Sequence, residues 1–132
     1  MSSQVDRVSY SPLKLTDLAV LMRGADPSTK WRLVAEFLEN YRWEPISSRY
    51  ELVADEPPLI HDIQWDTFLG GLAEFVTARD NQGSPAWSQE RQLERFWFPF
   101  NTPAARVDAF VHAPAAFRRR GIFISPQELV VV

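Results

Sequence analysis

The segment HDIQWDTFLGGLAEFVTARDNQG, residues 61–83, contains the signals that start, pattern and end a helix. Asp62 can accept hydrogen bonds from the free backbone amides of the first turn, so it is the predicted N-terminal cap. Asn81 to Gly83 are residue types that end helices. Between these ends, large apolar residues recur at helical spacing and predict a stripe that faces the core, made of Trp65, Phe68, Leu69, Leu72 and Val76.

Gly70 and Gly71 interrupt this helix with two residues that disfavour it. Each glycine costs about 1 kcal/mol of helix stability relative to alanine. Glycine lets a neighbouring element come close to the helix backbone, so we expect a second helix to pack here. A bend in the helix or a contact with a ligand is the alternative.

The segment ADPSTKWRLVAEFLENYRW, residues 25–43, predicts a second long helix. Asp26 is the expected cap, and Pro27 suits the first helical position. The apolar positions again have helical spacing, and they are Trp31, Leu33, Val34, Phe37, Leu38 and Tyr41.

A third helix is predicted in NTPAARVDAFVHA, residues 101–113. Thr102 is its expected cap, and Pro103 takes the first helical position. We expect the inner face of this helix to consist of its larger apolar residues together with one alanine, namely Ala104, Val107, Phe110 and Val111.

Shorter elements fill the rest of the chain. The patterns predict helices or helical turns over residues 14–22, 47–54, 88–96 (capped by Ser88), 114–121 and 125–128, and a short strand over residues 121–125. Gly121 is the expected left-handed residue that ends the helix before it. Prolines in the connections mark loops, and no repeat or linker divides the chain.

The fold class follows from these elements and from the length of 132 residues, which is that of one domain. We predict an all-α or mainly α fold: a compact multi-helix single domain with at most one short strand near residues 121–125. The domain spans residues 1–132, and residues 1–12 are expected to form a loosely ordered N-terminal arm.

Composition excludes several classes of protein. The chain has no cysteine, which excludes disulfides and thiolate metal sites. His61 and His112 lie far apart without carboxylates at metal-ligand spacing, so we expect no metal and no cofactor. The N-terminus lacks the apolar core of a signal peptide, and no run approaches the roughly 18 apolar residues of a membrane span. We therefore expect a soluble, cytoplasmic protein without a membrane partner.

No motif indicates catalysis. The chain lacks a glycine-rich phosphate loop, a zinc signature and a defensible Ser-His-Asp cluster. Asp55, Glu56 and Asp66 lie on predicted loops or first helical turns, where acids usually cap helices or face solvent. His112 lies where it can meet the negative end of a helix dipole. We predict that the protein is not an enzyme.

The run RFWFPF, residues 95–100, places four aromatic residues within five positions. Neither helical nor strand spacing hides all four on one face. The run is therefore a buried irregular corner, a surface that binds another protein, or a platform on which bases stack. The residues in question are Phe96, Trp97, Phe98 and Phe100.

The densest positive patch follows at Arg118, Arg119 and Arg120. These arginines can complement a helix dipole and pair with the acidic N-terminal half, or they can bind a partner. The formal net charge of the whole chain is -3, which argues against a general nucleic-acid binder. A helix-turn-helix needs a basic, polar recognition helix, and neither long helix is of that kind.

Most of residues 27–132 resembles a region of many actinobacterial proteins described as helix-turn-helix regulators, often encoded beside a predicted nucleotidyltransferase. The resemblance rests on the order of KWRLVAEFLENYRWEP, YELVADEPP, QWDTFLGGLAEFVTARDNQGSPAW and LERFWFPFNTPAARVDAFVHAPAAFRRRGIFIS. Such gene pairs are similar to type II toxin-antitoxin systems, in which the regulator neutralises the enzyme and represses the operon. The first 25 residues are too short for a helix-turn-helix domain, so the partner-binding half is what the resemblance carries over.

The sequence thus predicts a protein-binding module that acts as an antitoxin-like neutraliser of a companion nucleotidyltransferase-type toxin. The expected partner-binding residues are Trp97, Phe98, Phe100, Arg118, Arg119 and Arg120. The alternative is a transcriptional regulator that contacts DNA through Arg118 to Arg120. If the aromatic run is buried, the binding surface is expected instead on the acidic side, around Glu36, Glu39 and Glu44.

Overall fold

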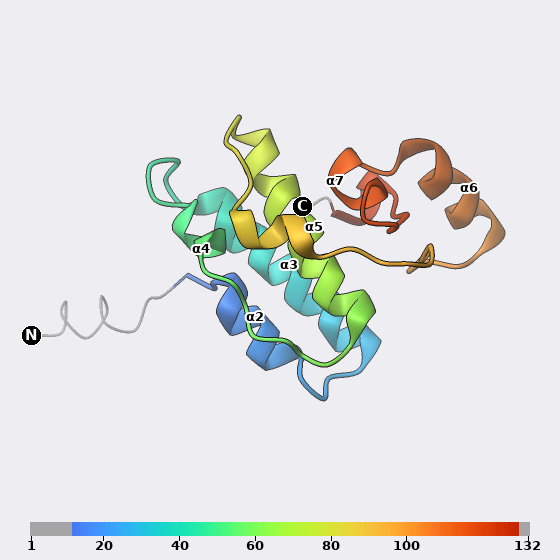
Figure 1. The fold of residues 1–132 in the computed structure, drawn as a ribbon, viewed down its shortest axis with the longest axis horizontal. Helices are drawn as coiled ribbons and strands as arrows, with labels where there is room; N and C mark the ends of the chain where they lie inside the picture. The colour runs from blue at the N-terminus through green and yellow to red at the C-terminus, as the bar shows by residue number, and fades with distance from the viewer. Residues whose placement is uncertain (1–11, 130–132) are drawn as a thin grey trace, which may run out of the picture.

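A computed structural model describes residues 12–129, and this part of the chain is mainly helical without a sheet (Figure 1). The predicted mainly α fold is therefore confirmed. The expected N-terminal arm falls almost entirely on residues 1–11, outside the described part. The elements are α2 (Leu15–Met22), α3 (Pro27–Trp43), α4 (Glu51–Ala54), α5 (Ile63–Arg79), the 3-10 helix η1 (Ala86–Glu90), α6 (Pro103–His112), α7 (Ala115–Arg118) and the 3-10 helix η2 (Pro126–Leu129).

Helix α5 is the centre of the molecule, and α2, η1 and α7 pack against it (Figure 1). Helix α3 joins it through aromatic rings: the Trp31 ring lies 4.8 Å from Trp65 and 5.2 Å from Phe68. The predicted apolar stripe is buried. Burial extends around the rest of the helix as far as Asp66 and Glu74, because elements cover α5 on several sides.

The predicted caps of the three longest helices are confirmed. The Asp62 carboxylate accepts from the backbone N–H of Gln64 at 3.1 Å, and Asp26 accepts from that of Thr29 at 2.7 Å. The Thr102 hydroxyl oxygen likewise accepts from a first-turn amide of α6. Each cap satisfies a backbone donor that has no partner within its helix. Asn81, with φ of 58°, is the left-handed residue after α5.

The glycine pair in α5 is a place of close approach, as predicted. A Cβ atom at Gly71 would lie 2.6 Å from Cδ1 of Phe117, the residue by which α7 packs on α5. A Cβ atom at Gly70 would lie 3.1 Å from Cβ of Arg91 and 3.3 Å from the Ser88 carbonyl oxygen. Gly71 therefore leaves the space that the Phe117 ring of α7 occupies, and Gly70 lies in close contact with η1 and Arg91.

Two of the shorter elements differ from expectation. Ser88 does not start a helix over residues 88–96; it lies buried inside η1, and its hydroxyl donates to the carbonyl of Pro85 at 2.7 Å. Residues 121–125 do not form a strand. They contribute one isolated parallel bridge between Ile122 and Trp97.

The orientation of α6 also differs from expectation. The residues predicted to face inward are exposed, and these are Ala104, Val107, Phe110 and Val111. Ala109 is buried instead, and Ala113 is buried just after the helix. The helix lies on the Phe98 and Phe123 rings, and alanine lets its backbone come close to them.

No helix of the described residues is long and apolar enough to cross a membrane.

We predict that Gly71→Ala destabilises the fold, because the new methyl group would overlap the Phe117 ring. Overpacking of this kind costs about 1–3 kcal/mol, and at a contact of 2.6 Å we expect this cost to outweigh the gain of about 1 kcal/mol in helix propensity. Urea unfolding measures the difference. Gly83→Ala is the matched control, because a Cβ atom there meets nothing within 4 Å. A Gly71→Ala protein as stable as the unaltered chain would contradict the close approach.

Candidate binding surface

The candidate site is built on a small second core beneath α6. Ala109, Ala113 and Phe123 are its buried members, and Phe98 packs against them. The Phe98 and Phe123 rings are stacked, with centroids 5.1 Å apart and an interplanar angle of 16°. This core is separate from the main core around α5. Figure 1 shows α6 standing at the edge of the molecule, away from the long helices.

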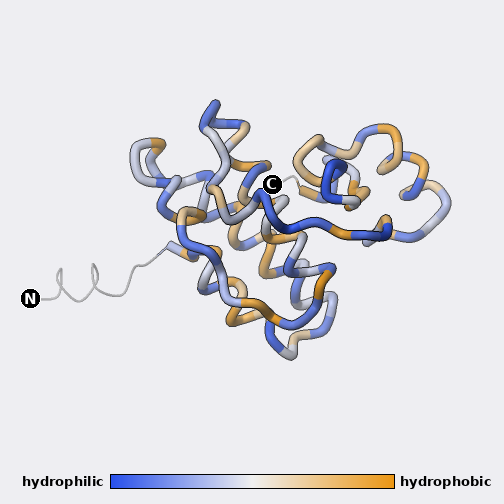
Figure 2. Tube along the Cα trace, viewed as in Figure 1, coloured by the Kyte–Doolittle hydropathy of each residue, from blue (hydrophilic) through white to orange (hydrophobic). Residues whose placement is uncertain are grey.

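The outer face of α6 carries large apolar side chains that nothing in the described structure covers. Val107 is 66% exposed, and Phe110 and Val111 are each 59% exposed. Phe96 is 71% exposed, and its ring and that of Phe110 both pack on Phe123. Figure 2 shows apolar stretches along the outlying α6 segment. We call Phe96, Val107, Phe110 and Val111 the α6 surface.

The amphipathic pattern of α6 is thus reversed. A helix on a protein surface normally turns its larger apolar residues toward the core. Here alanines face the core, while valines and a phenylalanine face outward. A shallow groove of about 580 Å³ runs along the outside of the helix, with Val107, Val111 and His112 in its lining.

Two arginines flank the α6 surface and are held by aromatic rings. The Arg106 guanidinium lies over the Phe98 ring, 4.1 Å from its centroid. The Arg118 guanidinium lies 5.4 Å from the centroid of Phe123 and donates to the carbonyl of Phe110 at 2.7 Å. Cation-π contacts and a hydrogen bond fix both side chains beside the exposed apolar residues.

The RFWFPF run is divided between the two cores. Phe96 and Phe98 contact Phe123. Trp97 points the other way and packs edge-on against Trp65, with ring centroids 5.6 Å apart. Phe100 packs on Trp31 in the main core. The opposite directions of residues 96 and 97 follow from the extended backbone that bridges to Ile122.

Of the predicted site residues, Phe98 and Arg118 therefore adjoin the α6 surface, and Trp97 and Phe100 chiefly tie it to the main core. The expectation for Arg120 is corrected. This side chain is 3% exposed, and its guanidinium donates to Glu74 at 2.6 Å and to the Ser88 carbonyl at 2.6 Å. It has no exposed group to offer a partner.

Arg119 is half-exposed and also paired. Its Nη2 atom lies 2.5 Å from Oε2 of Glu74, and its carbonyl accepts from the Gln92 side chain at 2.8 Å. Consecutive arginines thus have different environments: Arg118 lies beside α6, Arg119 lies on the surface over Glu74, and Arg120 lies inside.

Sequence reasoning assigned Val107, Phe110 and Val111 to the inner face of the helix. It left Phe96 out of the expected partner-binding residues and did not single out Arg106. The spacing of Ala105, Ala109 and Ala113 was the available signal, because these residues form their own stripe at every fourth position. Helix α6 therefore has one stripe of small residues and one of large residues, and either stripe could face the core. Only the shape of the surface beneath the helix decides between them.

The polar residues considered for chemistry have structural surroundings. Asp66 is buried and accepts from the backbone N–H of Ile60 at 2.8 Å, which closes the loop before α5. His61 is exposed in a left-handed conformation with φ of 66°. Across residues 12–129, no cluster of three or more His, Asp or Glu side chains could hold a metal ion.

No protein-family model matches the chain, and no curated protein or solved structure is significantly similar to it.

We predict that Arg120→Ala and Arg119→Ala differ sharply in stability. Removing one partner of a buried ion pair costs about 3–5 kcal/mol, because the other charge stays buried. A half-exposed pair contributes about 0–1 kcal/mol. Thermal or urea unfolding of both variants measures the contrast. Equal losses would show that the two arginines share the Glu74 charge evenly and that burial of Arg120 is not decisive.

Proposed function

We propose that this protein is a binding module that holds a companion protein on the α6 surface. One observation carries the proposal: α6 exposes its large apolar side chains and turns alanines toward the core. A fully buried Val or Phe side chain contributes about 1.5–3 kcal/mol relative to an exposed one. A partner that covers Val107, Phe110 and Val111 would gain this energy.

The composition of the surface supports a protein as the partner. Aromatic residues and arginines are enriched among the residues that dominate interface energy. Phe96 and Phe110 supply rings here, and Arg106 and Arg118 are fixed beside them. Side chains that are already held lose less conformational entropy on binding.

Charge indicates what kind of protein fits. Residues 91–125 contain six arginines and only two acids. Arg91 and Arg120 are buried and paired with Glu56 and Glu74, which leaves the other four near the surface. We infer a partner with an apolar patch and an acidic rim, because complementary charge speeds association and orients the two proteins.

The identity of the companion rests on the resemblance of the sequence motifs. That resemblance indicates a nucleotidyltransferase-type toxin, with this chain as the antitoxin-like neutraliser. The proposed role needs no catalytic residue in this chain. It requires that the bound module block the active site or a required movement of the enzyme.

The alternative of DNA binding through Arg118 to Arg120 retains a smaller positive patch than the sequence suggested. Arg120 is buried and Arg119 is paired with Glu74, which leaves Arg118 beside Phe110 and Phe123. A four-residue turn with a left-handed glycine does connect α2 to α3. The exposed positions of α3 carry both signs of charge, however, because Glu36 lies between Arg32 and Arg42 in the sequence, so this helix offers phosphate no continuous basic face.

The proposal is tested by co-purification with the product of the neighbouring gene, followed by calorimetry on a matched pair of variants. Val107→Asp places a charge at the centre of the α6 surface, and Val20→Asp places one on the exposed side of α2. We expect Val107→Asp to weaken binding by about 2 kcal/mol or more, and Val20→Asp to leave binding unchanged. Both melting temperatures should match, because each valine is more than half exposed.

Inhibition of nucleotidyl transfer by the purified module supplies the functional readout, and Val107→Asp should abolish it at concentrations where Val20→Asp inhibits fully. If instead Val107→Asp binds normally and Glu36→Lys disrupts the complex, the interface lies on the acidic side of α3. Steeply salt-dependent binding to duplex DNA at physiological salt would favour the regulator alternative.

A further inference from the structure

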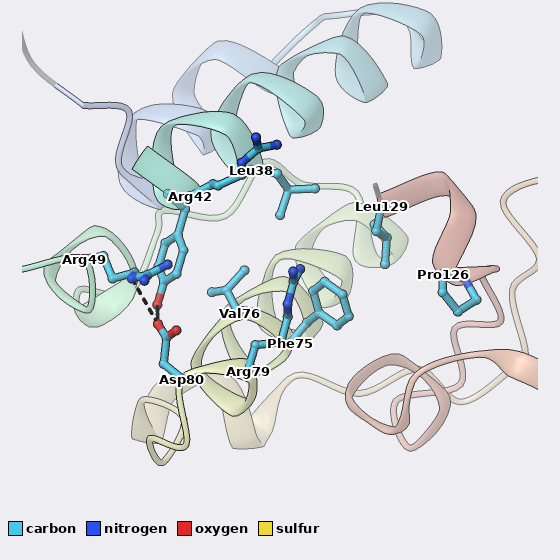
Figure 3. A pocket seen from close by; sticks show the side chains of 10 residues that line it. Leu38, Arg42, Arg49, Phe75, Val76, Arg79, Asp80, Pro126 and Leu129 are labelled. Atoms are coloured by element: carbon cyan, nitrogen blue, oxygen red, sulfur yellow. Dashed lines mark hydrogen bonds and ion pairs between the residues drawn. The ribbon is translucent and has the colours of Figure 1, made fainter. Parts of the chain in front are cut away.

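A second site lies apart from the α6 surface. A pocket of about 600 Å³ opens between α3, the C-terminal end of α5 and η2 (Figure 3). Its volume is within the usual range of small-molecule sites, about 300–1,000 Å³. It is lined by Leu38, Tyr41, Arg42, Arg49, Phe75, Val76, Arg79, Asp80, Pro126 and Leu129.

One side of the pocket is apolar. Leu38 comes from α3, Val76 from α5 and Leu129 from η2, and these three side chains converge from separate elements (Figure 3). All three belong to the main core and are largely buried. An apolar wall of this kind suits an aliphatic or aromatic group rather than a hydrated ion.

The single acid in the lining, Asp80, already has a hydrogen-bond donor and an arginine as partners. Asp80 follows α5 directly, where the negative end of the helix dipole disfavours a carboxylate. The Tyr41 hydroxyl donates to Asp80 Oδ2 at 2.9 Å, and Arg49 Nε lies 3.4 Å from the same oxygen. Burial and the Asp80 hydrogen bond raise the pKa of Tyr41, so it stays a neutral donor at physiological pH.

The remaining polar groups favour an anion. Arg79 lies at the pocket with its guanidinium 5.4 Å from the Phe75 centroid, between Phe75 and Val76 (Figure 3). Within residues 12–129 it has no carboxylate partner within 4.0 Å. Arg49 also lines the pocket, but its Nε atom is ion-paired with Asp80 at 3.4 Å. Arg42 is also in the lining and is ion-paired with Glu39 at 3.9 Å, so Arg79 is the arginine on which the argument rests.

We propose that this pocket binds a small organic carboxylate with an apolar body. The carboxylate lies against Arg79, because a charge-assisted bond to a planar guanidinium is strong and directional. The apolar body lies on Leu38, Val76 and Leu129. An inorganic anion would leave this wall uncovered, and a neutral apolar molecule would leave the Arg79 charge unused.

The test uses three probes on the full chain, each titrated while backbone amide shifts are followed by NMR. The probes are octanoate, 1-octanol and inorganic phosphate. We expect octanoate to shift amides around Phe75, Arg79 and Leu129, and to bind at least fivefold more tightly than octanol. Phosphate should produce no saturable shifts there.

Variants test the role of the arginine. Arg79→Gln should lower octanoate affinity at least fivefold and leave octanol affinity unchanged. Arg32→Gln, an exposed arginine elsewhere on α3, is the control and should change neither. Leu129→Lys should weaken both probes, because it charges the apolar wall.

Three results would overturn the proposal. Octanoate shifts confined to α6 would place the binding on the exposed apolar surface instead. Equal affinity for octanoate and octanol in the unaltered chain would show that the arginines play no part. Octanoate binding that survives Arg79→Gln at full strength would do the same.

Discussion

Arg120 holds the C-terminal third of the chain on the central helix. Its guanidinium meets Glu74 of α5 and carbonyl groups of η1 and α7 within 2.6–2.7 Å, so one side chain joins three elements. Burying a charged pair is costly unless geometry and further hydrogen bonds compensate. Here both arginine Nη atoms have partners, although Nε does not. The contacts of Arg120 with Glu74 and Ser88 hold α7 against α5, where Phe117 packs on Gly71. The turn after α7 leads to Ile122, which forms the bridge with Trp97.

The segments that form helices could be predicted because local chemistry determines them. Asp26, Asp62 and Thr102 cap their helices wherever those helices pack. Which face packs inward is a property of the neighbours, so the orientation of α6 could not be predicted from its spacing. Ser88 shows the same limit, because a serine that suits a cap also suits a buried 3-10 turn when a carbonyl is within reach.

The candidate surface was located only in part by the sequence. The aromatic run and the arginines were recognised as candidates from the sequence. Which of these side chains are buried and which are exposed depends on contacts between residues far apart in the chain. Adjacent arginines at a helix end point in different directions. Arg120 therefore forms a buried ion pair with Glu74, while Arg118 lies beside Phe123. The pocket near Arg79 is lined by residues of α3, α5 and η2. These residues are far apart in the sequence, so no local sequence pattern predicts the pocket.

The alanine stripe under α6 has an evolutionary consequence. Because the helix is attached through small side chains and a few rings, its outer positions contribute little to the free energy of folding. Substitutions there do not push the protein below the stability that function requires. Substitutions at the outer positions of α6 can therefore accumulate one at a time, while the scaffold around α5 stays the same.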